Sequence, residues 1–153
     1  MRYNCLTMTD SSVNPTWYAA GLAFECQQCG RCCSGPEEGY VWVTEVEIAQ
    51  IAALLGITPE RFRNHHCRRV SGRYTILEHR HSRNCTFLEP CHGGLGCSIY
   101  SVRPSQCRTW PFWQHNLDAP DDWARAGQRC RGINRGKLFT LEEIEGRLRR
   151  TSE

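Results

Sequence analysis

Four cysteines within eight residues constrain this chain more than any other feature of its sequence. The stretch Cys26–Cys33 reads Cys-Gln-Gln-Cys-Gly-Arg-Cys-Cys. Side chains so close in sequence cannot be spread over a hydrophobic core, so the four thiols must share one tight loop. Two intervening residues let a pair of sulfurs reach one metal centre, and thiolates are soft ligands that suit zinc and iron–sulfur clusters. The loop therefore predicts a metal site.

The rest of the chain offers only a thin apolar core. Hydrophobic residues make up 40% of the 153 residues, but 11 of them are cysteines. This length suits one domain. A structural zinc contributes on the order of 10–16 kcal/mol of apparent binding free energy in small peptides, which is comparable to the net stability of a whole domain. We therefore expect bound metal to decide whether the chain folds.

Eleven cysteines could instead form disulfides, and the cellular compartment decides between the two uses. The segment Met1–Asp10 has neither the apolar region nor the cleavage pattern of a signal peptide. No run of residues approaches the length of a membrane span. We therefore expect a cytoplasmic protein without membrane association, in which reduced thiols bind metal. The odd number of cysteines also leaves at least one without a partner.

Helix start signals stand at three places along the chain. Thr44 and Glu47 have the spacing of a capping box, and apolar residues at helical spacing lead from there to Gly56. A second helix is expected to begin at Thr58, which is followed by a proline. Another capping box at 140–143 opens a terminal helix.

Residues suited to strands occupy four segments: 40–43, 74–77, 84–88 and 97–100. A glycine-rich turn at 90–96 separates the last two, so Cys85 and Cys97 are expected to face each other across a β-hairpin. These patterns predict an α+β fold, namely a small metal-stabilised single domain with short helices, a β-hairpin and extensive irregular loops. We expect a flexible N-terminal arm at 1–15 and a cysteine-cluster metal-binding domain at 16–150.

Further cysteine-containing motifs follow the first loop: Cys85–Leu88, Cys97–Tyr100, Arg103–Arg108 with Pro111 and Phe112, and Cys130–Ile133 with Gly136 and Lys137. Together with the Cys26–Cys33 loop they resemble the YkgJ-type cysteine-cluster family, the CxxCxxCC zinc- or iron-chelating domain. The likeness spans roughly residues 24–148. A segment of this type also occurs in the flagellin lysine methylase, where it is associated with an iron–sulfur cluster. The resemblance implies a metal and no particular reaction.

Eight cysteines fall on family-like positions and are the candidate metal ligands: Cys26, Cys29, Cys32, Cys33, Cys85, Cys97, Cys107 and Cys130. Eight thiolates suffice for two four-thiolate centres, or for one cluster and one zinc. The first three match the spacing that holds a cubane cluster in bacterial ferredoxins, so an iron–sulfur cluster, with [4Fe–4S] as one form, or zinc is the expected cofactor.

Three cysteines lie outside this set, Cys5, Cys67 and Cys91, and are expected to be free thiols. A supplementary ligand role for Cys91 or His92 stays open, as does the weaker idea that Cys91 is a nucleophile. The group formed by Cys67 with its two histidine neighbours, His65 and His66, is a further conceivable ligand set.

Other side chains near the candidate ligands could support a metal centre. Arg31, Arg103 and Arg108 each lie within four residues of a candidate ligand and could offset thiolate charge. The aromatic residues that could either shield the centre from water or form the core are Trp42, Trp110, Phe112 and Trp113.

Two classes of function follow. The cysteine triplet with remote cysteines favours an iron–sulfur protein in a redox, electron-transfer or accessory role. The alternative is a zinc-stabilised module that binds another protein or nucleic acid, because zinc saturated by four cysteines has no open position for catalysis. A net charge of +3 does not require nucleic acid, so a protein partner is expected and the arginine clusters are interpreted as solvated helix faces. The sequence contains no Walker loop or dinucleotide fingerprint and leaves open whether the protein is an enzyme.

Overall fold

The computed structural model describes residues 16–91 and 94–151. Its helices are α1 (Glu45–Leu55), α2 (Pro59–His66), α3 (Ser105–Thr109), α4 (Gln114–Leu117), α5 (Pro120–Arg129) and α6 (Leu141–Thr151), with short 3-10 helices η1 (Arg31–Cys33) and η2 (Tyr100–Val102). Its strands are β1 (Leu22–Phe24), β2 (Trp42–Val43), β3 (Cys67–Val70), β4 (Arg73–Ile76), β5 (Leu88–Cys91), β6 (Gly94–Cys97) and β7 (Lys137–Phe139). The α+β class is confirmed. The expected arm at 1–15, with Cys5, and His92 lie outside the described residues.

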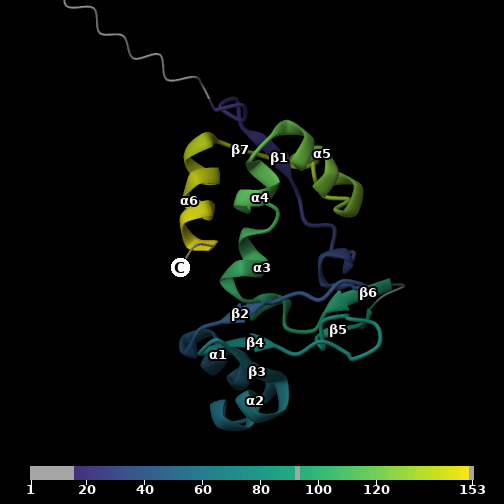
Figure 1. Ribbon diagram of the computed structural model, residues 1–153, viewed down its shortest axis with the longest axis vertical. Coiled ribbons are helices and arrows are strands. Elements are labelled where there is room, and N and C mark those ends of the chain that lie inside the picture. Colours follow the sequence, from purple (N-terminus) through teal and green to yellow (C-terminus); the bar gives the residue numbers. More distant parts are fainter. Residues whose placement is uncertain (1–15, 92–93, 152–153) are drawn as a thin grey trace, which may run out of the picture.

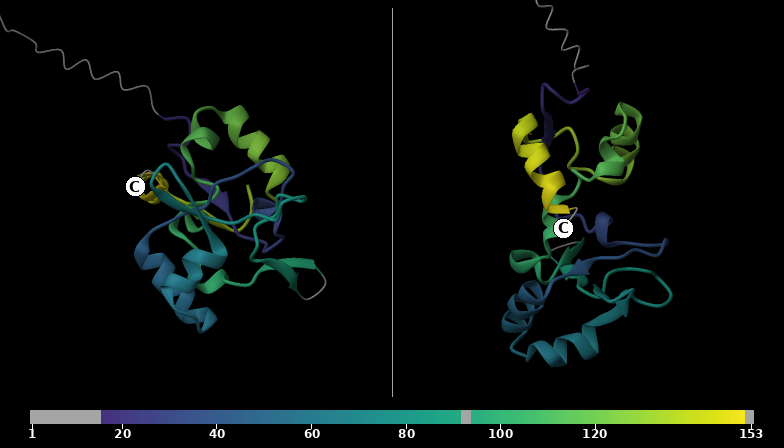
Figure 2. Two further views of the ribbon diagram at one scale, coloured as in Figure 1. Left: turned by 60° about the horizontal axis from the view of Figure 1, so that its bottom comes forward. Right: turned by 60° about the vertical axis from the view of Figure 1, so that its left-hand side comes forward.

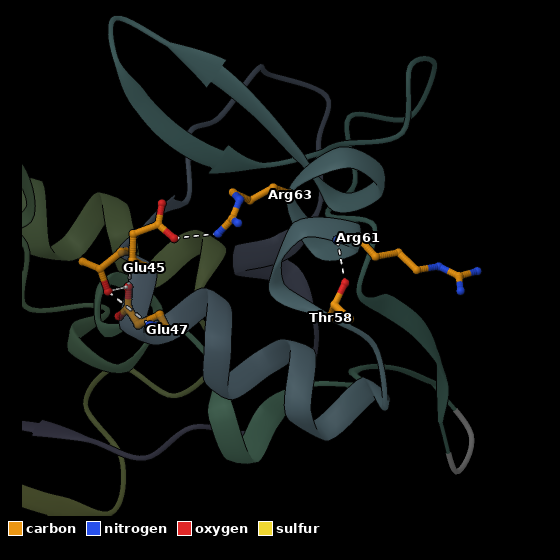
Figure 3. A network of polar contacts seen from close by, with 6 residues as sticks. Glu45, Glu47, Thr58, Arg61 and Arg63 are labelled. Atoms are coloured by element: carbon orange, nitrogen blue, oxygen red, sulfur yellow. Dashed lines mark hydrogen bonds and ion pairs between the residues drawn. The ribbon is translucent and has the colours of Figure 1, made fainter.

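Helices α1 and α2 begin where the sequence predicted. The Thr44 hydroxyl accepts a hydrogen bond from the Glu47 backbone N–H at 3.3 Å, and the Glu47 carboxylate accepts one from the Thr44 N–H at 2.8 Å. Gly56 ends α1 in a left-handed conformation with φ of 67°. Figure 3 shows the Thr58 cap of α2 and an ion pair of 2.7 Å that joins Arg63 of α2 to Glu45 of α1. The two helices therefore form one capped unit.

These helices pack with the antiparallel sheet β2-β4-β3 in the lower half of the molecule as drawn in Figure 1. Their shared core, here called the Phe62 cluster, consists of Val43, Ile48, Ile51, Ala52, Phe62, Cys67, Ile76, Phe87 and Ile99. Phe62 is fully buried and stacks on Phe87 with 6.1 Å between ring centroids. This cluster is an ordinary apolar core formed around sequence-local helices.

A second core occupies the upper half, where α4, α5 and α6 surround the two-stranded sheet of β1 and β7 (Figures 1 and 2). This Phe112 cluster consists of Phe112, Leu117, Trp123, Ala126, Ile133, Phe139 and Ile144. Phe112 is fully buried, with Trp123 and Phe139 rings at 5.6 and 4.9 Å. Phe112 is therefore a core residue. The terminal capping box is confirmed too, since the Thr140 and Glu143 backbone N–H groups bond reciprocally to the Glu143 and Thr140 side chains.

The strand predictions around the hairpin were partly wrong. Strand β5 begins only at Leu88, and Cys85 precedes it in a turn that forms an isolated bridge with Glu78. The hairpin pairs Leu88 with Cys97, after which the chain enters η2 instead of remaining extended. In the expected strand 84–88, the side chain of Phe87 is buried in the Phe62 cluster. The hydrophobicity of this segment therefore reflects burial and not the alternation of a strand.

The expectation that the arginine clusters are solvated helix faces was only partly right: Arg61 of α2 and Arg149 and Arg150 of α6 are exposed on helices, but other members are not. Arg68 and Arg69 lie in β3, and Arg68 pairs with Glu38 at 2.7 Å. Arg147 lies on α6, but its guanidinium stacks 4.6 Å from the centroid of the Phe139 ring. These cations cover aromatic rings because a guanidinium is weakly hydrated and attracted to a ring face. In the part of the chain that the structure describes, no helix has the length and hydropathy needed to span a membrane.

Candidate metal centre

One cavity between the Phe62 and Phe112 clusters is lined by every candidate cysteine: Cys26, Cys29, Cys32, Cys33, Cys85, Cys97, Cys107 and Cys130. This cysteine cavity has a volume of about 120 Å³. The cysteines reach it from the loop after β1, from η1, from the turn before β5, from the end of β6, from α3 and from the end of α5. The fold thus gathers at one place thiols that the sequence spreads over most of the chain. Their role as ligands stays a prediction.

The loop that carries the first four cysteines turns sharply at Gly30. Its φ of 69° is left-handed, and a Cβ placed there would lie 2.6 Å from Cδ1 of Leu88. The turn starts η1, which holds the sulfurs of Cys32 and Cys33 only 3.7 Å apart. The Cys33 carbonyl accepts a hydrogen bond from the Cys85 N–H at 2.8 Å. A backbone bond therefore joins the loop to the next cysteine segment.

The remaining cysteines are attached to both cores. Cys85 and Cys97 pack against the Phe62 cluster, and Cys130 packs against the Phe112 cluster. Cys107 lies on α3, whose first backbone N–H donates to Oε1 of Glu47 at 2.6 Å. The carboxylate that caps α1 thus also holds the start of α3, the helix that carries Cys107.

The two adjacent thiols differ in acidity. The hydrogen bond from Cys33 lowers the pKa of the Cys32 thiol to about 7, against the opposing effect of burial. The guanidinium groups of Arg129 and Arg103 lower the Cys32 pKa further. The pKa of Cys33 is raised, because its thiol donates to Cys32 and because it is buried. The first negative charge in the cavity is therefore favoured on Cys32.

The deeper thiols resist ionisation. Burial raises the pKa of the Cys85 thiol to about 11. Burial also raises the pKa of Cys107, and the neighbouring thiols Cys32, Cys85 and Cys97 raise it further by charge repulsion. Several buried thiolates cannot coexist without a compensating cation. A bound metal ion would supply that positive charge, so this electrostatic arrangement fits a metal.

Arginines surround the cavity in the manner that a negatively charged centre requires. Arg103 lines it and lies over the Tyr100 ring, 3.8 Å from the centroid. Arg31 and Arg108 line it too, in agreement with the sequence-based expectation. Arg129 was missed: it donates to the carbonyls of Arg31 and Ser34. Its position directly before Cys130 was the available signal.

Cys67 and Cys91 lie apart from the cavity. Cys67 is buried in the Phe62 cluster, and burial raises its pKa to about 11. The neighbouring His66 stacks on Phe62 and Phe87, with ring centroids 5.2 and 5.3 Å away. Cys91 is exposed in the hairpin. Cys67 is therefore a core residue, and its histidine neighbour serves in packing.

The donor chemistry of the cavity fits a zinc or iron centre. Among the described residues, no three histidine, cysteine, aspartate or glutamate side chains already converge closely enough to hold one ion. The sulfurs therefore line the cavity walls and would have to turn inward on loading, as expected where metal binding is coupled to ligand deprotonation and ordering. Cysteine thiolates are the ligand set of structural zinc and of iron–sulfur clusters.

A larger and more open cleft of about 790 Å³ borders the cysteine cavity. The residues that line both are Cys32, Cys33, Val41, Ile76, Cys85, Trp110 and Trp113. The rest of the cleft wall is mixed, with apolar residues such as Leu77 and Ala126 beside polar ones such as Glu37, Glu78 and Arg129. Thiols, indole rings and two aliphatic side chains thus lie between the cysteine cavity and the open cleft.

A cavity lined by eight cysteines in a small α+β fold defines a cysteine-cluster metal-binding protein. The sequence model of a protein family described as "CxxCxxCC: Putative zinc- or iron-chelating domain" matches residues 25–132, and the chain belongs to this family. It is 33% identical over 95 residues to "Uncharacterized protein MJ0661" of Methanocaldococcus jannaschii, a match that covers 62% of this chain and 48% of that protein. The chain thus spans about half the length of that curated relative. No solved structure matches.

Proposed function

We propose that this protein holds an iron–sulfur cluster and serves in a redox, electron-transfer or accessory role. The observation that carries the proposal is the gathering of eight cysteines around one cavity. Its volume of about 120 Å³ is about ten times what a single water molecule requires, which supports a polynuclear centre over a lone ion. The triplet Cys26, Cys29 and Cys32 has the ligand spacing of a cubane site.

The chain's own residues suit this role. A cluster, when bound, supplies a one-electron couple whose potential depends on nearby charge, hydrogen bonds and solvent exposure. Arg103 and Arg129 place positive charge beside the thiols, and the indoles of Trp110 and Trp113 restrict water. The cleft beyond Trp110, whose wall is partly polar and partly apolar, offers a surface on which a protein partner could approach the centre.

A second candidate function rests on one distance. The sulfurs of Cys32 and Cys33 are 3.7 Å apart. Two sulfurs bound to one tetrahedral zinc at about 2.3 Å would be separated by about 3.8 Å. In a cubane each iron takes one cysteine, so this pair suits one mononuclear ion better than two corners of a cluster. The protein would then be a zinc-stabilised binding module for another protein or nucleic acid.

Anaerobic purification followed by metal and sulfide analysis and a visible spectrum separates the two candidates. A brown protein with iron and acid-labile sulfide in cluster proportion supports the first. A colourless protein with one or two zinc ions per chain would refute it and support the second. Cys29→Ser is expected to lose metal, whereas Cys91→Ser, a matched change at an exposed thiol outside the cavity, is expected to retain it.

A further inference from the structure

The tryptophan indole groups show an inconsistency that a metal centre would resolve. The chain has five tryptophans. The Nε1–H groups of Trp17, Trp113 and Trp123 donate to Leu117 O, Gln106 O and Asn134 Oδ1 at 2.8, 3.0 and 2.9 Å. Nε1 of Trp110 is buried and has no acceptor among the described residues. A buried donor without a partner loses the hydrogen bonds that it would make with water, so such groups call for an explanation.

Trp110 lies where a metal centre could provide the missing acceptor. It follows Cys107 by three residues at the end of α3, and its side chain lines both the cysteine cavity and the outer cleft. Its ring meets that of Trp113 edge to face, with centroids 4.8 Å apart. Trp113 is itself fixed by its bonds to Gln106 O and Thr109 Oγ1. Trp110 is thus held against an anchored neighbour, beside the thiols.

We propose that Trp110 donates its indole N–H to a sulfur of the metal centre, either a cysteine thiolate or a bridging sulfide. This inference rests on the proposed function, since the acceptor is present only in the loaded protein. A centre bound by several thiolates carries excess negative charge on sulfur, which makes sulfur a good acceptor for a buried donor. Trp110 is then a positioning and tuning residue that sits between the centre and the cleft.

The bond has a direct electrochemical consequence in an iron–sulfur form. Reduction adds negative charge to the sulfurs, so a donor to sulfur stabilises the reduced state and raises the potential. Trp110→Phe should therefore shift the midpoint potential to more negative values while the iron and sulfide content stays at the wild-type level. Trp113→Phe is the matched control, because Trp113 lines the same cavity but its N–H is already bonded elsewhere. Equal potentials in wild type and Trp110→Phe, or an equal shift in both variants, would overturn the inference.

A measurement on the wild-type chain avoids reliance on the variant's folding and on iron. Cadmium binds four-thiolate sites and is diamagnetic, so the indole N–H resonances can be followed by NMR before and after cadmium loading. The Trp110 resonance is expected to move downfield and to exchange slowly with solvent once cadmium binds. An upfield resonance that ignores cadmium would mean that the N–H faces the Trp113 ring, and the inference would be wrong.

The two proposals fail in different ways. Loss of cadmium or iron in Cys29→Ser together with an unresponsive Trp110 resonance would leave the metal centre standing and remove only the indole bond. Wild-type protein that takes up no cadmium, iron or zinc would remove the metal-binding proposal itself, and the indole bond with it.

Discussion

The Phe62 cluster and the cysteine cavity both contain cysteine, and cysteine has a different role in each. In the Phe62 cluster, Cys67 is one apolar side chain among others, next to the fully buried Phe62. In the cavity, thiols such as Cys107 face other thiols, and burial and charge repulsion hinder their ionisation. The first region is stabilised by removing apolar surface from water. The second region would be stabilised only when a cation allows the thiols to ionise together.

The difference teaches how a chain with a thin core can still have a defined structure. Each half of the molecule has its own apolar cluster, and the cavity lies where the halves meet. Helix α3 spans the same junction, because its N-terminal end bonds to Glu47 and its Thr109 hydroxyl bonds to that of Thr151 at 2.7 Å. Apolar packing thus stabilises each half, while the thiols lie at the junction between the two apolar clusters.

Metal removal should have the largest effect, and it should act on the cysteine cavity more than on the Phe62 cluster. A chelator should lower the free energy of unfolding by an amount on the order of 10 kcal/mol, the scale of a structural thiolate site. Acidification should act in the same direction, because protonated thiols release metal. Hydrogen exchange would show lost protection in the segments 26–33 and 97–107, with stronger residual protection in α1. Unchanged protection of these two segments after complete metal removal would contradict the claim that bound metal stabilises the region around the cysteine cavity.

Phe62→Ala should weaken the apolar region alone. Phe62 is fully buried, and truncation of such a phenylalanine costs about 3–5 kcal/mol. We expect denaturation of the metal-loaded variant at lower urea concentration, with the wild-type amount of metal per folded chain. Loss of metal from the folded variant would show that the two regions are not separable.

Glu47→Ala should affect both regions, because its carboxylate caps α1 and also accepts the first N–H of α3. The expected loss is about 2 kcal/mol, the scale of a charge-assisted hydrogen bond. The matched variant Glu143→Ala removes the corresponding capping carboxylate of α6, which is exposed and bonds to Lys137. Thermal unfolding should show a smaller decrease for Glu143→Ala, and equal decreases would refute the linking role of Glu47.

Cys67→Ala should have the smallest effect, about 1 kcal/mol, similar to the loss of one buried methylene-sized group. Metal content should be unchanged, unlike that of a cavity variant such as Cys29→Ser. The native pKa of Cys67 is raised to about 11. The stability that Cys67 contributes should therefore be complete below about pH 9 and fall as the pH rises through 11, since the unfolded thiol ionises first. If the free energy of unfolding of wild type exceeded that of Cys67→Ala by an amount that grows with pH, this sign would be contradicted.

The sequence predicted the parts of the fold that depend on local signals. Thr44 and Thr58 mark the starts of α1 and α2, because a cap needs only residues within one turn of the helix. The pairing of β1 with β7 escaped prediction, since Leu22 and Phe139 come from opposite ends of the described chain. These strands are too short to show the apolar alternation by which a strand is predicted from sequence.

The candidate site was predicted by residue type and motif, without geometry. Cys85 and Cys97 were expected to face across a hairpin. Instead, Cys85 precedes β5 and Cys97 ends β6, and both line one cavity. Arg129 and the unpartnered indole of Trp110 were not singled out in these roles, because a missing acceptor exists only once the neighbours of a side chain are known.

The sequence by itself determined the thiol chemistry, the family and the capped helices, because ligand type and capping are properties of short segments. Only the tertiary structure decided that the Cys26–Cys33 loop and four remote cysteines share one cavity at the junction of two apolar clusters. Bringing distant thiols together depends on how α3, β6 and α5 pack, and packing is a property of the whole chain.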